Sequence, residues 1–136
     1  MAEFTHFKKD GSAVMVDVHE KPDTYRAASA TGTIQVSPEV FAAVRDHTAK
    51  KGDVLGVARL AGIMGAKKNA ELIPLCHIVP LTNCEVTFTT DENTNSITAV
   101  CTTSCVGKTG VEMEALTGVS TVLLTIYDMC KAMDRG

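Results

Sequence analysis

Residues 84–102 read CEVTFTTDENTNSITAVCT, and this stretch decides the fold. Apolar side chains occupy every second position in 84–88 and again in 97–101, with mostly polar side chains between them. A period of two is typical of a strand with one buried face. The turn between the two runs is rich in Asp and Asn, which favour tight connections. The stretch therefore predicts an antiparallel hairpin whose apolar face is covered by helices, an α+β arrangement.

Upstream, residues 26–36 show the same alternation and predict another strand, with its even-numbered positions buried. Ser37, Pro38 and Glu39 follow it directly. They supply an N-cap, a proline in the first helical turn and an early acidic residue. We therefore expect a short helix from this point to about Arg45.

A second helix is predicted over residues 54–67, with Asp53 as its cap. Gly56, Gly62 and Gly65 lie inside it, and each glycine in a helix interior costs about 1 kcal/mol against alanine. Such a cost is accepted where another backbone must come close. We expect these glycines to mark a helix contact.

Residues 109–133 form the longest helical pattern in the chain. No residue from 115 to 127 is charged, and a helix without a charged face is usually buried on both sides. Because a chain of this size has little else to supply a second cover, we expect a homo-oligomer with this helix near a subunit contact. The apolar stripe predicted to lie on the sheet consists of Leu116, Val119, Leu123, Ile126, Cys130 and Met133.

Composition limits the domain count and the kind of partner. The chain has 136 residues, of which 45% are hydrophobic, which suits one domain over residues 1–136, with residues 1–14 as a flexible N-terminal arm. A net charge of −3 gives no basic face for a nucleic acid. No apolar run suggests a membrane span or a signal peptide, so we expect a cytoplasmic protein. The five cysteines show no paired short spacing that predicts a disulfide framework or a zinc site.

Charged residues stand at both ends of the long helix. Asp128 and Lys131 end the uncharged run, and their spacing is typical either of a surface ion pair or of an acid/base group beside a cation. Glu114 lies 14 positions before Asp128 on nearly the same face, a separation of about 21 Å along a helix. Within one subunit, these two carboxylates cannot act on one bond.

His77 lies in an apolar stretch directly after Cys76. A histidine in that setting is either a hydrogen-bonded core residue or an acid/base catalyst. The two neighbours lack a second pair of ligands at metal-binding spacing, so no metal site is predicted. Lys50 and Lys51, before the second helix, are either solvated or an anion cradle at the positive end of that helix.

Several long strings go further than these patterns, because together they resemble the molybdenum cofactor biosynthesis protein C family (MoaC), the cyclic pyranopterin monophosphate synthases. The N-terminal run MVDV at residues 15–18, followed by Lys21 and Arg26, also fits that family, so the resemblance spans residues 15–134. The other strings are KGDVLGVAR at 51–59, LIPLCH at 72–77, KTGVEMEALT at 108–117 and LTIYDMCK at 124–131.

The resemblance implies a ferredoxin-like α+β sandwich, with an antiparallel sheet and helices on one face. It also implies a hexamer, built as a trimer of dimers with active sites at the dimer interface. The implied enzyme is a lyase that rearranges (8S)-3′,8-cyclo-7,8-dihydroguanosine 5′-triphosphate to cyclic pyranopterin monophosphate and releases pyrophosphate. No cofactor is implied, apart from Mg²⁺ that could accompany the triphosphate.

The same resemblance assigns site residues. Those implied in catalysis are Asp128, Lys51, Lys131 and His77. Those implied in substrate binding are Leu75, Cys76, His77, Met113, Glu114, Glu112, Arg26 and Lys21. Two other hypotheses remain at this point: a catalytically silent nucleotide-binding oligomer, in which Asp128 only pairs with Lys131, and a thiol-based metal or redox protein that uses Cys76.

Overall fold

The computed structural model describes residues 11–134. Within them, three strands form one antiparallel sheet in the order β1-β3-β2. Both predicted parts of the sheet, the hairpin and the upstream strand, are confirmed, and each strand extends somewhat beyond its alternating pattern. The strands are β1 (Thr24–Gln35), β2 (Asn83–Asp91) and β3 (Ser96–Gly107).

The two faces of this sheet differ as the alternation predicts. One face carries fully buried side chains, such as those of Ile97 and Cys101. The other face carries hydroxyl groups that pair across strands, including Thr33 and Thr98, whose side-chain oxygens are 2.8 Å apart. The core therefore lies on one side of the sheet only.

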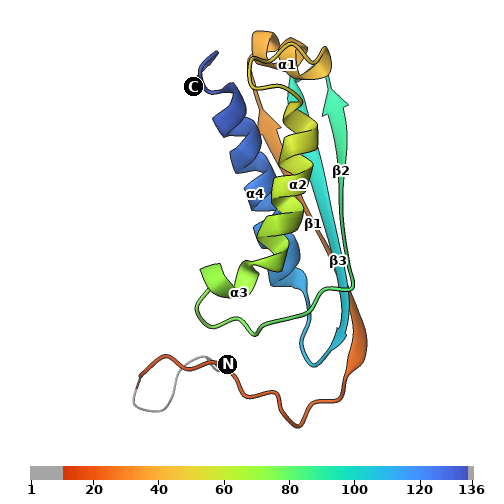
Figure 1. The fold of residues 1–136 in the computed structure, drawn as a ribbon, viewed down its shortest axis with the longest axis vertical. Helices are drawn as coiled ribbons and strands as arrows, with labels where there is room; N and C mark the ends of the chain where they lie inside the picture. The colour runs from red at the N-terminus through yellow and green to blue at the C-terminus, as the bar shows by residue number, and fades with distance from the viewer. Residues whose placement is uncertain (1–10, 135–136) are drawn as a thin grey trace.

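All the helices that pack on the sheet lie on this apolar side (Figure 1). The two longest helices run side by side across it. The N-caps predicted for the first two helices are both present: the Ser37 side chain accepts from the Val40 amide at 3.2 Å, and the Asp53 side chain accepts from the Gly56 amide at 3.1 Å. The α+β sandwich with helices on one face is thus confirmed. The helices are α1 (Pro38–Arg45), α2 (Val54–Lys67), α3 (Asn69–Leu72) and α4 (Glu112–Cys130).

Small residues allow α2 and α4 to approach closely. A Cβ atom added at Gly62 would lie 2.3 Å from Val122 Cγ2 and 3.2 Å from the Gly118 carbonyl oxygen. Gly65 is similarly close to α4, so the expectation of a helix contact is confirmed for both. It is wrong for Gly56, whose Cβ would instead meet the capping side chain of Asp53.

The sequence pattern misjudged how α4 is buried. Leu116 was expected on the sheet but is 47% exposed. The sheet covers one side of α4 and α2 covers another, so the buried residues of α4 do not form the single stripe that was predicted. The second cover is thus α2 of the same chain. The helix is also shorter than the predicted 109–133. Its buried residues are Glu114, Ala115, Gly118, Val119, Val122, Ile126 and Cys130.

The outer sides of α2 and α4 remain apolar and exposed. The side chain of Leu124 is 68% exposed and that of Leu60 is 59% exposed. We call this surface the outer apolar face; it consists of Val57, Leu60, Met64, Leu116, Leu124 and Tyr127.

None of the helices in the described part of the chain has the length and apolarity needed to span a bilayer.

The N-terminal segment precedes β1 at the end of the molecule where α3 lies (Figure 1). Of the predicted arm, residues 1–10 lie outside the described residues. Residues 11–23 contain no helix and no extended strand. Part of this segment nevertheless contacts the body of the protein, as described below.

Candidate active site

An aspartate between two lysines lies at the C-terminal end of α4. Lys131 Nζ is 2.9 Å from Asp128 Oδ1, and Lys51 Nζ is 3.6 Å from Asp128 Oδ2. Lys51 also donates to the backbone carbonyl of Asp128 at 3.4 Å. The structure thus brings together three of the four residues that sequence reasoning assigned to catalysis.

The loop between α1 and α2 positions Lys51. Gly52 adopts φ +99, a left-handed conformation that glycine takes readily, and its amide donates to the Ala49 carbonyl at 3.0 Å. Asp53 then caps α2. Because α2 runs antiparallel to α4, the beginning of α2 lies beside the end of α4, where Asp128 is.

The two lysines keep this carboxylate ionised. The hydrogen bond and charge of Lys131, followed by the charge of Lys51, hold the pKa of Asp128 below its ordinary value. All three side chains are substantially exposed, at 58% for Asp128, 51% for Lys51 and 38% for Lys131. The arrangement offers solvent a carboxylate that can accept a proton, beside two cations that can bind an anion.

The opposite end of α4 borders a cavity of about 440 Å³. Three segments that are far apart in the sequence form its wall: the N-terminal segment, the loop after α3 and the first turn of α4. Seven of the residues that sequence reasoning assigned to the site line it. They are Lys21, Leu75, Cys76, His77, Glu112, Met113 and Glu114.

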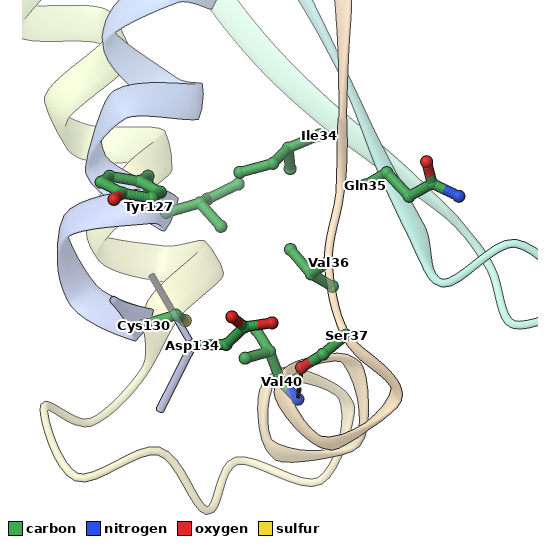
Figure 2. A pocket seen from close by; sticks show the side chains of 9 residues that line it. Ile34, Gln35, Val36, Ser37, Val40, Tyr127, Cys130 and Asp134 are labelled. Carbon is green, nitrogen blue, oxygen red and sulfur yellow. Dashed lines mark hydrogen bonds between the residues drawn. The ribbon is translucent and has the colours of Figure 1, made fainter. Parts of the chain in front are cut away.

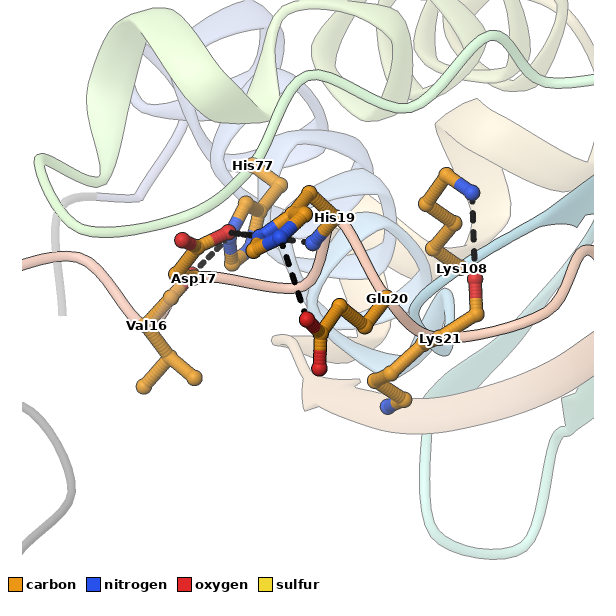
Figure 3. A network of polar contacts seen from close by, with 7 residues as sticks. All are labelled: Val16, Asp17, His19, Glu20, Lys21, His77 and Lys108. Carbon is orange, nitrogen blue, oxygen red and sulfur yellow. Dashed lines mark hydrogen bonds and ion pairs between the residues drawn. The ribbon is translucent and has the colours of Figure 1, made fainter.

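His77 is oriented by the N-terminal segment. Its Nε2 donates a hydrogen bond to the Val16 carbonyl oxygen, which accepts only, so Nε2 carries a proton. Nδ1 is then the ring atom available for proton exchange. Figure 3 shows the ring against this segment, next to Asp17 and His19. His77 is therefore held by a hydrogen bond, as a core histidine would be, and it also faces a cavity, as a catalyst would.

Glu114 is the buried acid of this cavity, with a residue exposure of 4%. Burial is the main cause that raises its pKa, and the nearby charge of Glu112 acts in the same direction. A hydrogen bond from Asn69 Nδ2 to Glu114 Oε2, at 3.3 Å, opposes the rise. The two ends of α4 thus carry carboxyl groups with opposite pKa shifts, one exposed and lowered and the other buried and raised.

Lys108 ties the N-terminal segment to the end of β3. Its Nζ donates to the Lys21 carbonyl oxygen at 3.0 Å (Figure 3) and lies 3.5 Å from Asp23 Oδ1. A second hollow, of about 630 Å³, opens beside it and shares His77 with the first cavity. Sequence reasoning included Lys108 only in the string at 108–117 that carries the family resemblance, and its role as a tether had no local signal.

Arg26 lies apart from the other residues that the resemblance implies in substrate binding. It does not line the cavity that holds the other predicted substrate contacts. Its Nη2 donates to the Lys108 carbonyl at 3.3 Å, and its Nε is buried without a partner among the described residues. In this structure Arg26 therefore supports the turn at Lys108.

A further hollow, of about 350 Å³, lies between the end of β1, α1 and the end of α4 (Figure 2). Its walls combine apolar side chains, such as those of Val36 and Ile34, with polar ones, such as those of Ser37 and Asp134. None of the residues that sequence reasoning assigned to the site line it. Within residues 11–134, no three His, Cys, Asp or Glu side chains are grouped so that they could hold a metal ion.

The two predicted parts of the site are therefore separated within one chain. The 14 positions from Glu114 to Asp128 correspond to about 21 Å along α4. An acid/base group acts on a proton at about 3 Å, or through one water. One chain alone does not bring the lysine-flanked aspartate and the His77 cavity to the same bond.

Comparison with known proteins gives this arrangement a family. A family model described as the MoaC family matches residues 15–136. The chain is also 56% identical over 133 residues to a protein of Clostridium botulinum (strain Alaska E43 / Type E3) named cyclic pyranopterin monophosphate synthase. That match covers 98% of this chain and 84% of the relative. The chain belongs to the MoaC family.

Proposed function

We propose that this protein is a cyclic pyranopterin monophosphate synthase. It converts (8S)-3′,8-cyclo-7,8-dihydroguanosine 5′-triphosphate to cyclic pyranopterin monophosphate and pyrophosphate, a step of molybdenum cofactor biosynthesis. Family membership and the name of the relative from Clostridium botulinum support the proposal. The structural observation that carries it is the convergence of three separate segments on one cavity, with an ionised aspartate between two lysines at the other end of the same helix.

In this proposal, the Asp128 cluster handles the proton transfers and the leaving group. An ionised carboxylate can take a proton from a nitrogen or oxygen of the substrate. Closing the cyclic phosphate expels pyrophosphate, and the growing negative charge is stabilised by Lys51 and Lys131. The lowered pKa of Asp128 supports its role as the base.

The cavity around His77 binds the pterin-forming part of the substrate. Leu75, Cys76 and Met113 supply contact surface, while Lys21 adds a positive charge for phosphate. His77 exchanges protons through Nδ1, since Nε2 is occupied by the Val16 carbonyl. Proton exchange and charge stabilisation by side chains suffice in this scheme, so we propose no cofactor beyond Mg²⁺ bound with the triphosphate.

A second copy of the chain completes the site. The separation of about 21 Å along α4 supports this, because Asp128 of one chain must then meet the cavity of its neighbour. The outer apolar face supports an assembly as well, since exposed apolar patches of this kind mark contact surfaces. We propose a hexamer, arranged as a trimer of dimers, that works in the cytoplasm.

A turnover assay tests the function. The purified protein is incubated with the cyclised dihydro-GTP nucleotide, and pyrophosphate and pterin fluorescence are followed over time. We expect release of both products, and we expect Asp128→Asn to lose turnover while its assembly stays intact. Full turnover by Asp128→Asn would remove Asp128 from the mechanism, and no turnover by the wild type would overturn the proposed function.

A further inference from the structure

Asn69 is a buried polar residue that sequence reasoning did not select. It opens α3, directly after α2, and is only 1% exposed. A polar side chain buried this deeply is stable only when its hydrogen bonds are made. Its partners are therefore informative about what it does.

Both ends of its amide are used, and both partners lie on α4. Asn69 Nδ2 donates to Glu114 Oε2 at 3.3 Å, and Asn69 Oδ1 accepts from the Thr117 hydroxyl at 2.6 Å. Glu114 and Thr117 are one turn apart on the same face of the helix. The amide thus connects α3 to α4 at the point where the carboxyl of Glu114 enters the cavity wall.

The backbone of Asn69 also leads toward the cavity. Its carbonyl accepts from the Ile73 amide at 2.9 Å, which closes α3, and the chain then continues into the loop that carries His77. Asn69 is therefore fixed from both the backbone and the side chain. It acts on the cavity through Glu114 and does not line the cavity itself.

We infer that Asn69 is a positioning residue that, together with Thr117, holds the Glu114 carboxyl in place and sets its protonation state for the reaction. The inference rests on the proposed function in one respect: Glu114, which lines the cavity proposed to bind the substrate, is taken to act in turnover as the ionised carboxylate. It assigns to Asn69 no contact with the substrate. The hydrogen-bond chain from Thr117 through Asn69 to Glu114 is the basis for it.

The amide can serve both protonation states of the carboxyl. When Glu114 is ionised, it accepts a hydrogen bond from Nδ2, and Oδ1 accepts one from the Thr117 hydroxyl, as in the structure. When Glu114 is protonated, it can donate to Oδ1 of an amide turned by half a rotation, and Nδ2 then donates to the Thr117 hydroxyl. A side chain of the same shape without polar atoms can do neither.

The other charged or titratable groups around Glu114 come from three directions. Glu112 on α4 raises the pKa of Glu114 by charge. Burial first, and the charge of Glu114 second, raise the pKa of Cys105 on β3. His77 and Lys21 face the same cavity. Since burial already favours the neutral acid, losing the donor of Asn69 must move the pKa of Glu114 further upward.

Four variants test the inference. Asn69→Leu removes the hydrogen bonds of Asn69 with Glu114 and with Thr117. Thr117→Val removes only the bond between Thr117 and Asn69, and valine has the same shape as threonine. Thr117→Ser keeps the hydroxyl and should behave as the wild type. Thr125→Val is the matched control, because Thr125 donates only to the Thr121 carbonyl one turn earlier, at 2.7 Å.

We expect Asn69→Leu to lower kcat by roughly 10- to 100-fold, the range of a lost hydrogen bond to a charged group, with a smaller change in KM. The acidic limb of the kcat profile should move to higher pH. Thr117→Val should show the same changes more weakly. A uniform loss of kcat with an unmoved acidic limb in both variants would mean that Asn69 only supports the fold, and the inference would be wrong.

A measurement without substrate separates this inference from the proposed function. The carboxyl carbon of Glu114 is followed by NMR in protein labelled with ¹³C at the glutamate side chain, and the signal is assigned by its loss in Glu114→Gln. Titration should give a higher pKa in Thr117→Val than in the wild type or Thr125→Val. Equal values would overturn the role of Asn69 and Thr117 even if the enzyme turns over as proposed, and a raised value would uphold it even if the substrate is different.

Discussion

Two inactive variants should restore activity when they share an oligomer. Asp128→Ala removes the base at one end of α4, and His77→Ala removes the cavity histidine near the other end. Each alone should lose turnover. If the two groups serve one bond, they must come from different chains, because within one chain they are separated by far more than the roughly 3 Å over which an acid/base group acts.

The size of the restoration follows from symmetry. In a two-fold pair, each site takes its aspartate from one chain and its cavity from the other. A mixed pair then has one site with both native groups and one site with neither. Random pairing at equal expression makes half of the pairs mixed, so about a quarter of the wild-type activity should return.

The assay is co-expression of the two variants under separate tags and turnover of the cyclised nucleotide by the whole co-expressed pool. Tandem purification of a separate portion proves that mixed oligomers formed. Asp128→Ala co-expressed with itself under both tags is the matched control and should stay inactive. Verified mixed oligomers that remain inactive would refute the shared site. Both functional groups would then have to act within one chain, despite their separation along α4 of about 21 Å.

Other predictions concern the charge, the packing and the surface of α4. Lys131→Met should raise the pKa of Asp128 toward its ordinary value, because Lys131 is the main cause that lowers it. Turnover falls at acidic pH as Asp128 is protonated, so the acidic limb of the pH–rate profile should move to higher pH. An unmoved limb would contradict this. Gly62→Ala should destabilise the protein by roughly 1–3 kcal/mol in urea unfolding through overpacking, since its Cβ would lie 2.3 Å from Val122 Cγ2. Adding Val122→Ala to the same chain should recover part of that stability. If the losses of the two single variants simply add in the double variant, the clash is contradicted. Leu124→Asp should shift the protein to smaller species in size-exclusion chromatography if the outer apolar face is a contact, whereas an unchanged elution volume would exclude Leu124 from that contact.

The sequence predicts well those features that depend on neighbouring residues. Ser37 and Asp53 cap their helices as predicted because a cap needs only the chain within three residues of it. The strands follow from alternation for the same reason. Leu116 was misjudged because its burial depends on where α2 lies, which no periodicity within α4 reports.

The site divides in the same way. Leu75 could be selected from the sequence only through family resemblance, whereas His77 and Glu114 were already candidates by residue type. The convergence of all three on one cavity required the fold. Asn69 gave no signal at all, because α3 is only four residues long and a buried asparagine resembles any loop residue in sequence. Arg26 was implied in substrate binding by the resemblance. The hydrogen bond of its guanidinium to the Lys108 carbonyl depends on the pairing of β1 with β3, which no local pattern reports.

The contact between α2 and α4 explains why the chemistry lies at the ends of α4. Close packing at Gly62 leaves no room for a charged side chain in the middle of the helix, because a buried unpaired charge is too costly. The antiparallel course of α2 then places its preceding loop, with Lys51, at one end of α4. Asn69, two positions after the last residue of α2, lies at the other end. One helix contact thus sets the surroundings of both Asp128 and Glu114. A shift of α2 along α4 would therefore move Lys51 relative to Asp128 and Asn69 relative to Glu114 at the same time.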